Sequence, residues 1–493
     1  LLKSLGQASQ KPVIYWGDAL TSPFGNNYLD LDDTEIKQVV LDATTAYVQA
    51  LMWYITEEEI YRENALKIFD NYSRTNSMLI HVKDDRIRVS LAVAKFAVAA
   101  EILRYSKFDG TKELEWQDKH TVGFTKYLQL MRPRYDRYWH YMNQQNFCTA
   151  ATAAAAIFRN DVDLYNKAIQ RITTNPELKD YNARVDCGGA LCDRNGDCTL
   201  HAISGDILSQ IREVTVDKSF REEKALSQGK SVIGRAVEPN IQLIELGRDV
   251  GHAYCDVGYF SYLAFTALAQ GTKVNNDPKS EQYGQASSEE DAVNLFEFAE
   301  HRILKGANYM VKYTLGYDTL YVPSLVGTDK WGGHSVFKQV SDERGGPENE
   351  YWNRFDAACT GIYNYYRYYD EGKAAVENGE VTEDDMKYLE QAVIRLHPEA
   401  LDADNFIGFG TLLYSGADPG ERDTITEKEY PALQNATLDS ATPDAKFEDD
   451  NYLYVGGSYN TYVQFDLSQI EEQDMGGLTA LGLEVRHSER DPG

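Results

Sequence analysis

The strongest constraint on this fold is a succession of amphipathic helical patterns between about residues 32 and 400. From Asp32 to Tyr54, apolar residues recur every three or four positions, which places them on one face of a helix. Similar patterns predict further helices at about 59–69, 85–106, 146–171, 252–270, 289–314, 350–369 and 382–396. Paired helices with few convincing strands between them predict an all-α fold, an (α/α) toroid or barrel, with a small C-terminal β segment.

Two helix starts carry the spacing of a capping box, in which an N-cap side chain and a glutamate three residues later satisfy each other's backbone donors. Asp32 with Glu35 gives the first, and Thr56 with Glu59 gives the second. These pairs predict where the first two helices begin.

The polarity and periodicity of the sequence change twice. The stretch 172–240 is polar and irregular, which indicates a long insertion in a helical domain that spans 1–414. A turn-rich segment at 415–430 reads as a linker. In 431–493 the runs YLYVGG, TYVQFDLS and LTALGLEVRHS alternate like strands, too few for a complete β-sandwich, so we expect a partial one.

Charge argues against one class of partner and hydropathy against another. The 493 residues carry a formal net charge of -28 at pH 7, and nucleic-acid binding normally needs a basic face, so we expect no nucleic-acid partner. No apolar run reaches the roughly 18 residues needed to span a bilayer, so we expect no membrane partner either.

Cysteines crowd into one loop-like stretch, CGGALCDRNGDC, with Cys187, Cys192 and Cys198. It could hold a disulfide in an exported protein. The spacing is not that of a zinc site, and a calcium loop would need a glutamate where Ser204 stands. We therefore predict neither a metal site nor a cofactor.

The segment IELGRDVGHAY gathers four groups that can carry chemistry: Glu245, Arg248, Asp249 and His252. If the turn is helical, Arg248 and His252 share a face, and the guanidinium lowers the pKa of the imidazole and keeps it neutral. A neutral histidine is a usable general base. The alternative is an ordinary ion pair at a helix start and a core histidine.

Two more segments place polar groups on predicted helices. Arg302 and Tyr309 lie seven apart, two turns of one helix, and a guanidinium near a phenol would lower its pKa. Asn143 and Asn146 lie three apart beside two glutamines, and amides in an apolar helix must find partners. Packing in a helix interface is the alternative for both.

Together these groups suit β-elimination in a uronate polymer, which loses its C5 proton and then the glycosidic oxygen at C4. Negative charge builds up on the C5 carboxylate, where amide and arginine donors stabilise it. Tyrosine and histidine transfer the protons, and the reaction requires no metal.

The segments WYITEEEIYRENALKIFDNYS, ELGRDVGH, HRILKGANYMVKYTLG and FIGFGTLLY, in this order, resemble the alginate lyase domain family of helical-toroid polysaccharide lyases. This group includes polysaccharide lyase family thirty-eight. The likeness spans roughly residues 30 to 414, and GRDxGH followed by R(x)6Y is its most discriminating part. It implies an α/α toroid that cleaves alginate, or the related glucuronan, by β-elimination.

The same resemblance implies roles for individual residues. His252 corresponds to the catalytic histidine, Tyr309 to the catalytic tyrosine and Arg302 to the arginine two turns before it. Asn143 or Asn146 corresponds to the asparagine that neutralises the carboxylate. The tail, through YLYVGGSYNTYVQFDLS, resembles part of a β-sandwich carbohydrate-binding module.

We therefore expect a secreted enzyme acting on an anionic polysaccharide, with poly-mannuronate as the first choice. There Tyr309 would serve as both base and acid, while His252 positions the carboxylate or acts as base on guluronate. Trp331, His334 and Arg354 are candidate subsite residues, with Arg248 beside them as a substrate-binding residue.

Two other functions stay open at this point. A glycoside hydrolase would need two carboxylates flanking the bond, and Glu245 with Asp249 could be proposed for it. A sugar-binding protein on an inactive lyase scaffold is the non-enzymatic alternative.

Overall fold

The computed structural model describes most of the helical region and short parts of the remainder. The described residues are 28–31, 33–75, 77–80, 85–106, 115–136, 143–174, 206–216, 237–317, 319–321, 324–327, 334–337, 340, 355–393, 432–439 and 459–465.

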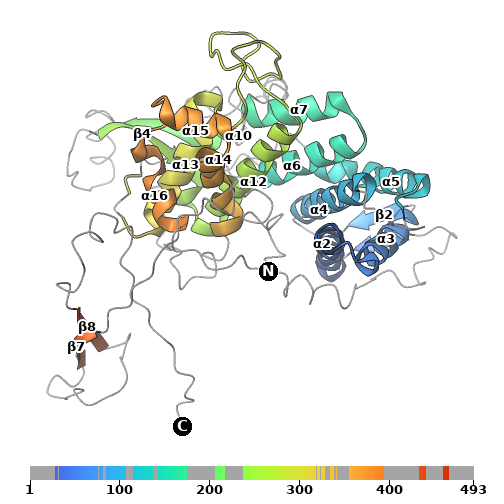
Figure 1. Ribbon diagram of the computed structural model, residues 1–493, viewed down its shortest axis with the longest axis horizontal. Helices are drawn as coiled ribbons and strands as arrows, with labels where there is room; N and C mark the ends of the chain where they lie inside the picture. Colours follow the sequence, from blue (N-terminus) through green and yellow to red (C-terminus); the bar gives the residue numbers. More distant parts are fainter. Residues whose placement is uncertain are drawn as a thin grey trace. The chain divides into compact units, whose positions relative to one another are not determined.

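Most of this part of the chain is helical, as predicted (Figure 1). The N-terminal helices are α2 (Asp33–Thr56), α3 (Glu59–Ser73), α4 (Asp85–Tyr105), α5 (Asp118–Tyr135), α6 (Asn143–Phe158) and α7 (Val162–Thr173). The later ones are α10 (Asp206–Gln210), the 3-10 helix η1 (Ile244–Gly247), α12 (Val250–Ala269), α13 (Phe298–Thr314), the π-helical η3 (Asp356–Thr360), α14 (Gly361–Tyr368), α15 (Asp370–Glu377) and α16 (Glu383–Val393).

Strands occur in two-stranded sheets. β1 (Tyr28–Leu31) pairs in parallel with β2 (Ser77–Ile80). The other pairs are antiparallel: β3 (Ile211–Val216) with β4 (Val237–Leu243), β5 (Ser324–Gly327) with β6 (His334–Phe337), and β7 (Ala432–Asp439) with β8 (Tyr459–Phe465).

The chain divides into two compact units, Leu1–Gly416 and Ala417–Gly493, and this division lies within the predicted linker at 415–430. The first unit holds all the helices named above, and the second contains the β7–β8 hairpin. β8 overlaps the predicted run TYVQFDLS, whereas β7 has no counterpart among the predicted strands. The predicted runs YLYVGG and LTALGLEVRHS lie outside the described residues.

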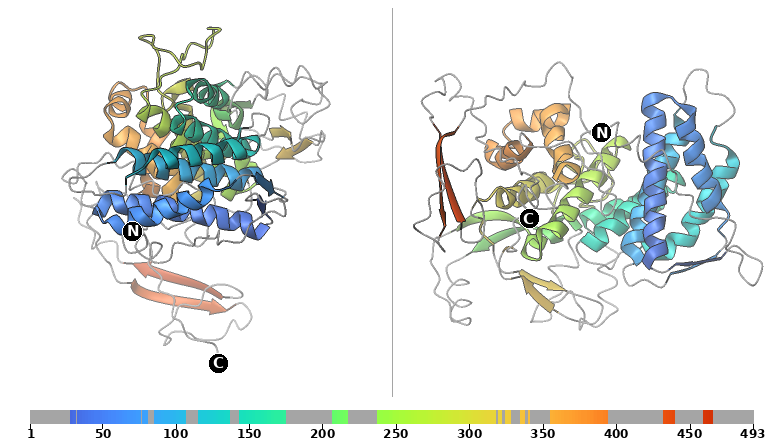
Figure 2. Two further views of the ribbon diagram at one scale, coloured as in Figure 1. Left: turned by 90° about the vertical axis from the view of Figure 1, so that its right-hand side faces the viewer. Right: turned by 90° about the horizontal axis from the view of Figure 1, so that it is seen from below.

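Helix packing in the first unit follows a row of neighbours. α2 packs on α3 and α4, α4 packs on α5 and α6, and α6 packs on α7 and α12. In both views of Figure 2 the blue α2 lies beside the lighter blue α4. α12 in turn packs on α13 and η3. In the row α2, α4, α6 and α12, each helix therefore contacts the next member of the row.

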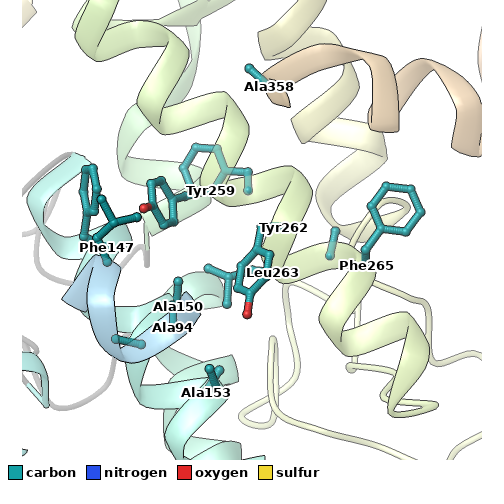
Figure 3. Packing of buried hydrophobic residues seen from close by; sticks show 14 of the residues in the cluster. Ala94, Phe147, Ala150, Ala153, Tyr259, Tyr262, Leu263, Phe265 and Ala358 are labelled. Carbon is teal, nitrogen blue, oxygen red and sulfur yellow. The ribbon is translucent and has the colours of Figure 1, made fainter. Parts of the chain in front are cut away.

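Small residues let the middle of this row approach closely. α6 carries a run of alanines, and Ala150 and Ala153 are fully buried against α12 and α4 (Figure 3). Beside them the rings of Phe147 and Tyr259 lie with centroids 4.2 Å apart. Since bulky side chains on α6 would push its neighbours away, this alanine face fixes how near α12 lies to α6.

Two predicted boundaries are wrong. The single helix predicted at 146–171 is two helices, because Asn160 adopts a left-handed conformation (φ 53°) and the Asp161 carboxylate caps α7 by accepting from the backbone N–H of Leu164. The helix predicted from 289 begins only at Phe298, after a series of turns.

The capping box expected at Thr56 and Glu59 is also absent from the α3 start. Thr56 is the last residue of α2, and its hydroxyl bonds back to the Met52 carbonyl at 2.7 Å. Glu58 occupies the N-cap of α3 without a side-chain capping bond. The side chains of the other expected box, Asp32 with Glu35, lie outside the described residues.

Within the predicted insertion, 172–240, the described part is ordered secondary structure. α10 and β3 pack into the first unit, where Ile207, Gln210 and Ile211 are fully buried. Reading the whole stretch as irregular was therefore wrong for 206–216 and for 237–240, which begin β4. The stretch with Cys187, Cys192 and Cys198 lies outside the described residues.

Candidate active site

The start of α12 is shaped by one aspartate. The backbone of Asp249 is extended (φ −165°, ψ 160°), so Arg248 and His252 do not lie on one helical face as the sequence led us to expect. The Asp249 carboxylate accepts the backbone N–H of His252 at 2.8 Å, which is the bond of an aspartate N-cap. Helix α12 therefore begins at Val250.

The same carboxylate holds the imidazole of His252. Nδ1 of His252 lies 2.7 Å from Oδ1 and 2.6 Å from Oδ2 of Asp249. With a proton on Nδ1 donated to the carboxylate, Nε2 of a neutral ring is left as an acceptor. The side chain of His252 is 38% exposed, so this nitrogen belongs to a ring that solvent reaches. The group in contact with the His252 ring is thus the Asp249 carboxylate, whereas the sequence analysis considered the Arg248 guanidinium as its neighbour.

Burial tends to raise the pKa of Asp249, but the hydrogen bonds from the side chain and backbone of His252 outweigh it. The charges of His252 and Arg248 act in the same direction, and the net pKa lies below the usual value. Asp249 is therefore an anion at neutral pH, able to stabilise the imidazolium that forms when His252 accepts a proton.

Arg248, Asp249 and His252 form the His252 corner at the start of α12. A second carboxylate connects this corner to α6. Glu245 in η1 is fully buried, and it accepts from the backbone N–H of Asn143 at 3.2 Å and from its Nδ2 at 2.8 Å. Nη1 of Arg248 also donates to Glu245, at 3.0 Å, and Nε of Arg248 lies 3.7 Å from Asp249. Asn143, Arg248 and His252 are thus joined through Glu245 and Asp249.

The other candidate asparagine lies in a separate buried cluster. Nδ2 of Asn146 donates to Gln210 at 2.8 Å and to Asp256 at 3.0 Å, and Nε2 of Gln210 donates back to Oδ1 of Asn146 at 2.8 Å. All three residues are fully buried. Asn146 therefore ties α6 to α10 and α12, while Asn143, beside Glu245, is the asparagine nearer to His252 in the chain of contacts.

Tyr309 is buried on α13, with 6% of its surface exposed, and its hydroxyl donates to the Leu320 carbonyl at 2.7 Å. Burial raises the pKa of this phenol, and Tyr321 raises it further. The expectation that Arg302 lowers the pKa of Tyr309 is wrong, because burial dominates and Nη1 of Arg302 donates to the Ile211 carbonyl at 3.3 Å. Tyr309 is neutral at ordinary pH.

A short connection relates Tyr309 to the His252 corner. Leu320 accepts from Tyr309, and the next residue, Tyr321, donates to the carbonyl of Ile244 in η1 at 2.6 Å. Glu245 follows Ile244 directly. Arg302 is related to η1 less directly: it donates to the carbonyl of Ile211, Ile211 pairs with Leu243 in the β3–β4 sheet, and Leu243 directly precedes Ile244.

Arg302 follows a rare backbone feature. Ala299, Glu300 and His301 are all left-handed, with φ between 52° and 60°, so α13 begins with a left-handed turn. Left-handed geometry costs non-glycine residues roughly 1–2 kcal/mol each. Buried contacts hold the turn: Asn276 accepts from the backbone N–H of Ala299 at 2.9 Å, and Nδ1 of His301 lies 3.0 Å from the Tyr366 hydroxyl.

The remaining candidates are only partly covered. Trp331 and Arg354 lie outside the described residues, and His334 is the first residue of β6, where the structure describes the backbone only. Within the described ranges, no group of three or more His, Cys, Asp or Glu side chains is placed to hold a metal ion. No helix in those ranges is long and apolar enough to cross a membrane.

Sequence reasoning missed how Asp249, Glu245 and Gln210 are used. An aspartate three residues before a histidine at a helix start is a readable signal, because an N-cap side chain faces the first turn. Glu245 and Gln210 gave no such signal, since their partners on α6 lie 102 and 64 residues away.

Comparisons of the chain with protein-family models, with curated proteins and with solved structures find no match. The likeness to the alginate lyase domain family therefore rests on the motifs in the sequence. What the site can do is argued from its own groups: a partly exposed histidine held by an anionic aspartate, and an arginine beside that aspartate.

Proposed function

We propose that the protein is a polysaccharide lyase that cleaves a uronate polymer, alginate or glucuronan, by β-elimination on an (α/α) toroid. The observation that carries the proposal is the Asp249–His252 pair, with its Nδ1–carboxylate contacts of 2.6 and 2.7 Å and its partly exposed imidazole. The row of helices α2, α4, α6 and α12, each packed on the next, supports the toroid.

In the proposed reaction Nε2 of His252 takes the proton from C5 of the sugar. The electron pair of that C–H bond forms the C4–C5 double bond, and the C4–O bond breaks. The leaving oxygen takes a proton from an acid. Asp249 stabilises the imidazolium, and Arg248, 40% exposed beside it, faces the charge that develops on the C5 carboxylate.

Tyr309 suits the acid in this scheme better than the base. Because burial raises its pKa, the phenol keeps its proton at ordinary pH and has one to give. Its hydroxyl would first have to leave the Leu320 carbonyl, to which it donates in the structure. With His252 as base and Tyr309 as acid, the two groups differ, which suits anti elimination in guluronate more than the mannuronate preference expected from the sequence.

Hydrolysis is less well supported. The two carboxylates available for it, Glu245 and Asp249, are both committed: Glu245 is fully buried and bonded to Asn143 and Arg248, and Asp249 holds His252. A hydrolase needs one carboxyl group as acid and the other as base or nucleophile. Both carboxylates are therefore occupied by contacts within the protein.

The test is to incubate the protein with poly-mannuronate, poly-guluronate and glucuronan and follow the ultraviolet absorbance of an unsaturated uronate. Tyr309→Phe removes only a hydroxyl and should abolish the absorbance without unfolding the protein. New reducing ends without absorbance would indicate a hydrolase instead. Binding without either product would indicate an inactive sugar-binding scaffold.

A further inference from the structure

An exposed aromatic ring lies where the end of α13 meets α16, two helices that pack against each other (Figure 1). Tyr317, just past the end of α13, is 44% exposed, and its ring centroid lies 4.9 Å from that of Tyr388 on α16. The Tyr317 hydroxyl donates to Oε1 of Gln391, also on α16, at 2.9 Å. The ring of Tyr317 is therefore held in place by two neighbours while solvent still reaches it.

Two lysines lie over the Tyr388 ring, and their charges are compensated to different degrees. Nζ of Lys312 is 5.7 Å and Nζ of Lys387 is 5.2 Å from the ring centroid. Lys387 lies 2.6 Å from Oδ1 of Asp384, and the charge of Glu383 acts on it as well. Within the part of the chain that the structure describes, Lys312 has no carboxylate partner. Lys312 is therefore the cation on this surface that an anionic ligand can pair with.

Gln391 leaves a hydrogen-bond donor on the same surface. Its Oε1 accepts the Tyr317 hydroxyl, so the group that remains is Nε2, which can only donate. Among the residues that the structure describes, Nε2 of Gln391 has no acceptor. Gln391 and Lys312 are both only partly buried, so an acceptor from outside the protein can reach them.

An exposed ring, a cation and an amide donor together suit an anionic sugar. A tyrosine ring packs against the C–H groups of a sugar, and polar groups beside it bond to the sugar oxygens. A lysine next to the ring adds a charge-assisted bond to a carboxylate. A neutral sugar would leave Lys312 without use, and an apolar protein surface would bury both Lys312 and Nε2 of Gln391 without partners.

A short segment joins this surface to the proposed active site. Leu320, three residues after Tyr317, supplies the carbonyl that accepts the Tyr309 hydroxyl. Three residues of extended chain span at most about 11 Å, so Tyr317 lies close to the residue that covers Tyr309. Leu320 is itself 38% exposed, and the surface is therefore continuous along this segment.

We propose that Tyr317, Lys312 and Gln391 form a subsite that binds one uronate residue of the polymer away from the bond that is cleaved. The Tyr317 ring packs on the sugar, Nζ of Lys312 pairs with its carboxylate, and Nε2 of Gln391 donates to one of its oxygens. This inference rests on the proposed function, because it takes the ligand to be a uronate polymer. The subsite supplies a local positive charge in a chain whose net charge is -28.

The test measures binding apart from catalysis, in a His252→Ala background that does not consume the polymer. Affinity gel electrophoresis with poly-mannuronate, poly-guluronate and glucuronan should show the protein retarded by at least one of them, and not by a neutral glucan. Tyr317→Ala and Lys312→Gln should each weaken that binding about tenfold, the effect of one aromatic or charge-assisted contact.

Two matched controls lie elsewhere on the helices. Tyr105 at the end of α4 is 59% exposed and has the Arg104 guanidinium 5.0 Å from its ring centroid, so Tyr105→Ala removes a similar ring beside a similar charge. Lys67→Gln removes an exposed positive charge on α3. Both control variants should bind the polymer as the His252→Ala protein does.

The outcomes separate the subsite from the lyase activity. If Tyr317→Ala and Lys312→Gln are retarded as strongly as the controls, or if no uronate polymer retards the His252→Ala protein, the subsite is wrong. Retardation by the neutral glucan that Lys312→Gln leaves unchanged overturns the assignment to a uronate. Loss of self-association in Tyr317→Ala, measured by sedimentation, would assign the ring to a contact between protein copies and overturn the subsite too.

Kinetics of the protein with His252 intact complete the test. If it makes unsaturated product while Tyr317→Ala leaves KM unchanged, the subsite is wrong and the proposed function stands. Binding that depends on Tyr317 and Lys312, in a protein that forms no unsaturated product, leaves the subsite and refutes the lyase. Circular dichroism checks that each variant is folded, and Lys312→Gln decides if Tyr317→Ala is not.

Discussion

Helices α12 and α13 each carry a histidine in the first turn, and the surroundings of these two rings differ. His252 on α12 is 38% exposed and lies against the Asp249 carboxylate. His301 on α13 is buried, with Nδ1 3.0 Å from the Tyr366 hydroxyl and Nε2 3.7 Å from Glu380. An imidazole that solvent reaches and that lies beside an anion can exchange protons with a ligand, whereas a buried imidazole mainly stabilises the fold. The position of a histidine in a helix therefore does not reveal its role; its solvent access and partner do.

The largest expected effect separates these roles directly. His252→Ala should lower lyase activity by about a thousandfold, because a positioned general base contributes that much, while thermal unfolding changes little. His301→Ala should do the opposite: it should lower the free energy of unfolding by about 2 kcal/mol, as expected for a buried polar contact, and leave kcat of the folded protein nearly unchanged. Assays and thermal scans of the two variants check this. Equal loss of activity in both variants would contradict the different roles assigned to His252 and His301.

Replacing Asp249 tests what its carboxylate does for the partly exposed His252. Asp249→Ser keeps an N-cap oxygen but removes the anion beside the imidazole, whereas Asp249→Ala removes both. We expect both to lower kcat about a hundredfold, and only Asp249→Ala to lose about 1 kcal/mol of stability as well. Full activity of Asp249→Ser would show that the carboxylate serves only as a helix cap.

The buried histidine should make stability depend on pH. Burial lowers the pKa of His301 below its usual 6.5, helped by Lys305 and opposed by Glu380 and Asp385. The unfolded chain then binds this proton more readily than the folded one. Stability is therefore fully present above pH 6.5 and falls as the pH drops from there toward the folded-state pKa.

Urea unfolding from pH 7.5 to 5 checks this, with His301→Gln expected to show a shallower slope. The buried His120, whose pKa burial also lowers, gives a slope of the same sign. His120→Gln is thus the matched control, and the two reductions should add in the double variant. If the free energy of unfolding of His301→Gln depended on pH as steeply as that of the unmodified protein, the burial of His301 would not be the cause of the pH dependence.

The smallest effect concerns the left-handed turn itself. Glu300→Gly should raise the free energy of unfolding by about 0.5 kcal/mol, because relief of a left-handed residue exceeds the extra entropy of glycine in the unfolded chain. Glu290→Gly is the control, since Glu290 is also exposed but does not have a positive φ, and it should be neutral or destabilising. Chemical denaturation measures both. Destabilisation by Glu300→Gly would indicate that the glutamate side chain stabilises the turn.

Hydrophobic periodicity was enough to predict the helices that build the row from α2 to α12, because each buries one regular face. The break between α6 and α7 had a local signal in the sequence, because asparagine tolerates the left-handed conformation and aspartate is a good N-cap. The hydrophobic periodicity alone did not show this break. The left-handed turn carried none, since Ala299 and Glu300 have no preference for that conformation. It depends on acceptors and rings brought in by other segments.

The site was predicted in its residue types more than in its contacts. His252 and Arg248 do not share the helical face that the sequence predicted; both lie against Asp249, and the pairing of His252 with Asp249 follows from the extended backbone of the cap. Burial raises the pKa of Tyr309, Tyr321 raises it further, and the carbonyl of Leu320 accepts its hydroxyl. No local pattern in α13 indicates these contacts.

Glu245 has a consequence for how the corner around His252 comes into being. Its carboxylate is bonded to a residue 102 positions earlier in the chain, so neither α6 nor η1 can complete the corner alone. A fragment that ends before η1 keeps Asn143 but lacks its acceptor. Enzyme turnover, once established, would therefore report when the two distant segments have docked during refolding, later than helix content alone would indicate.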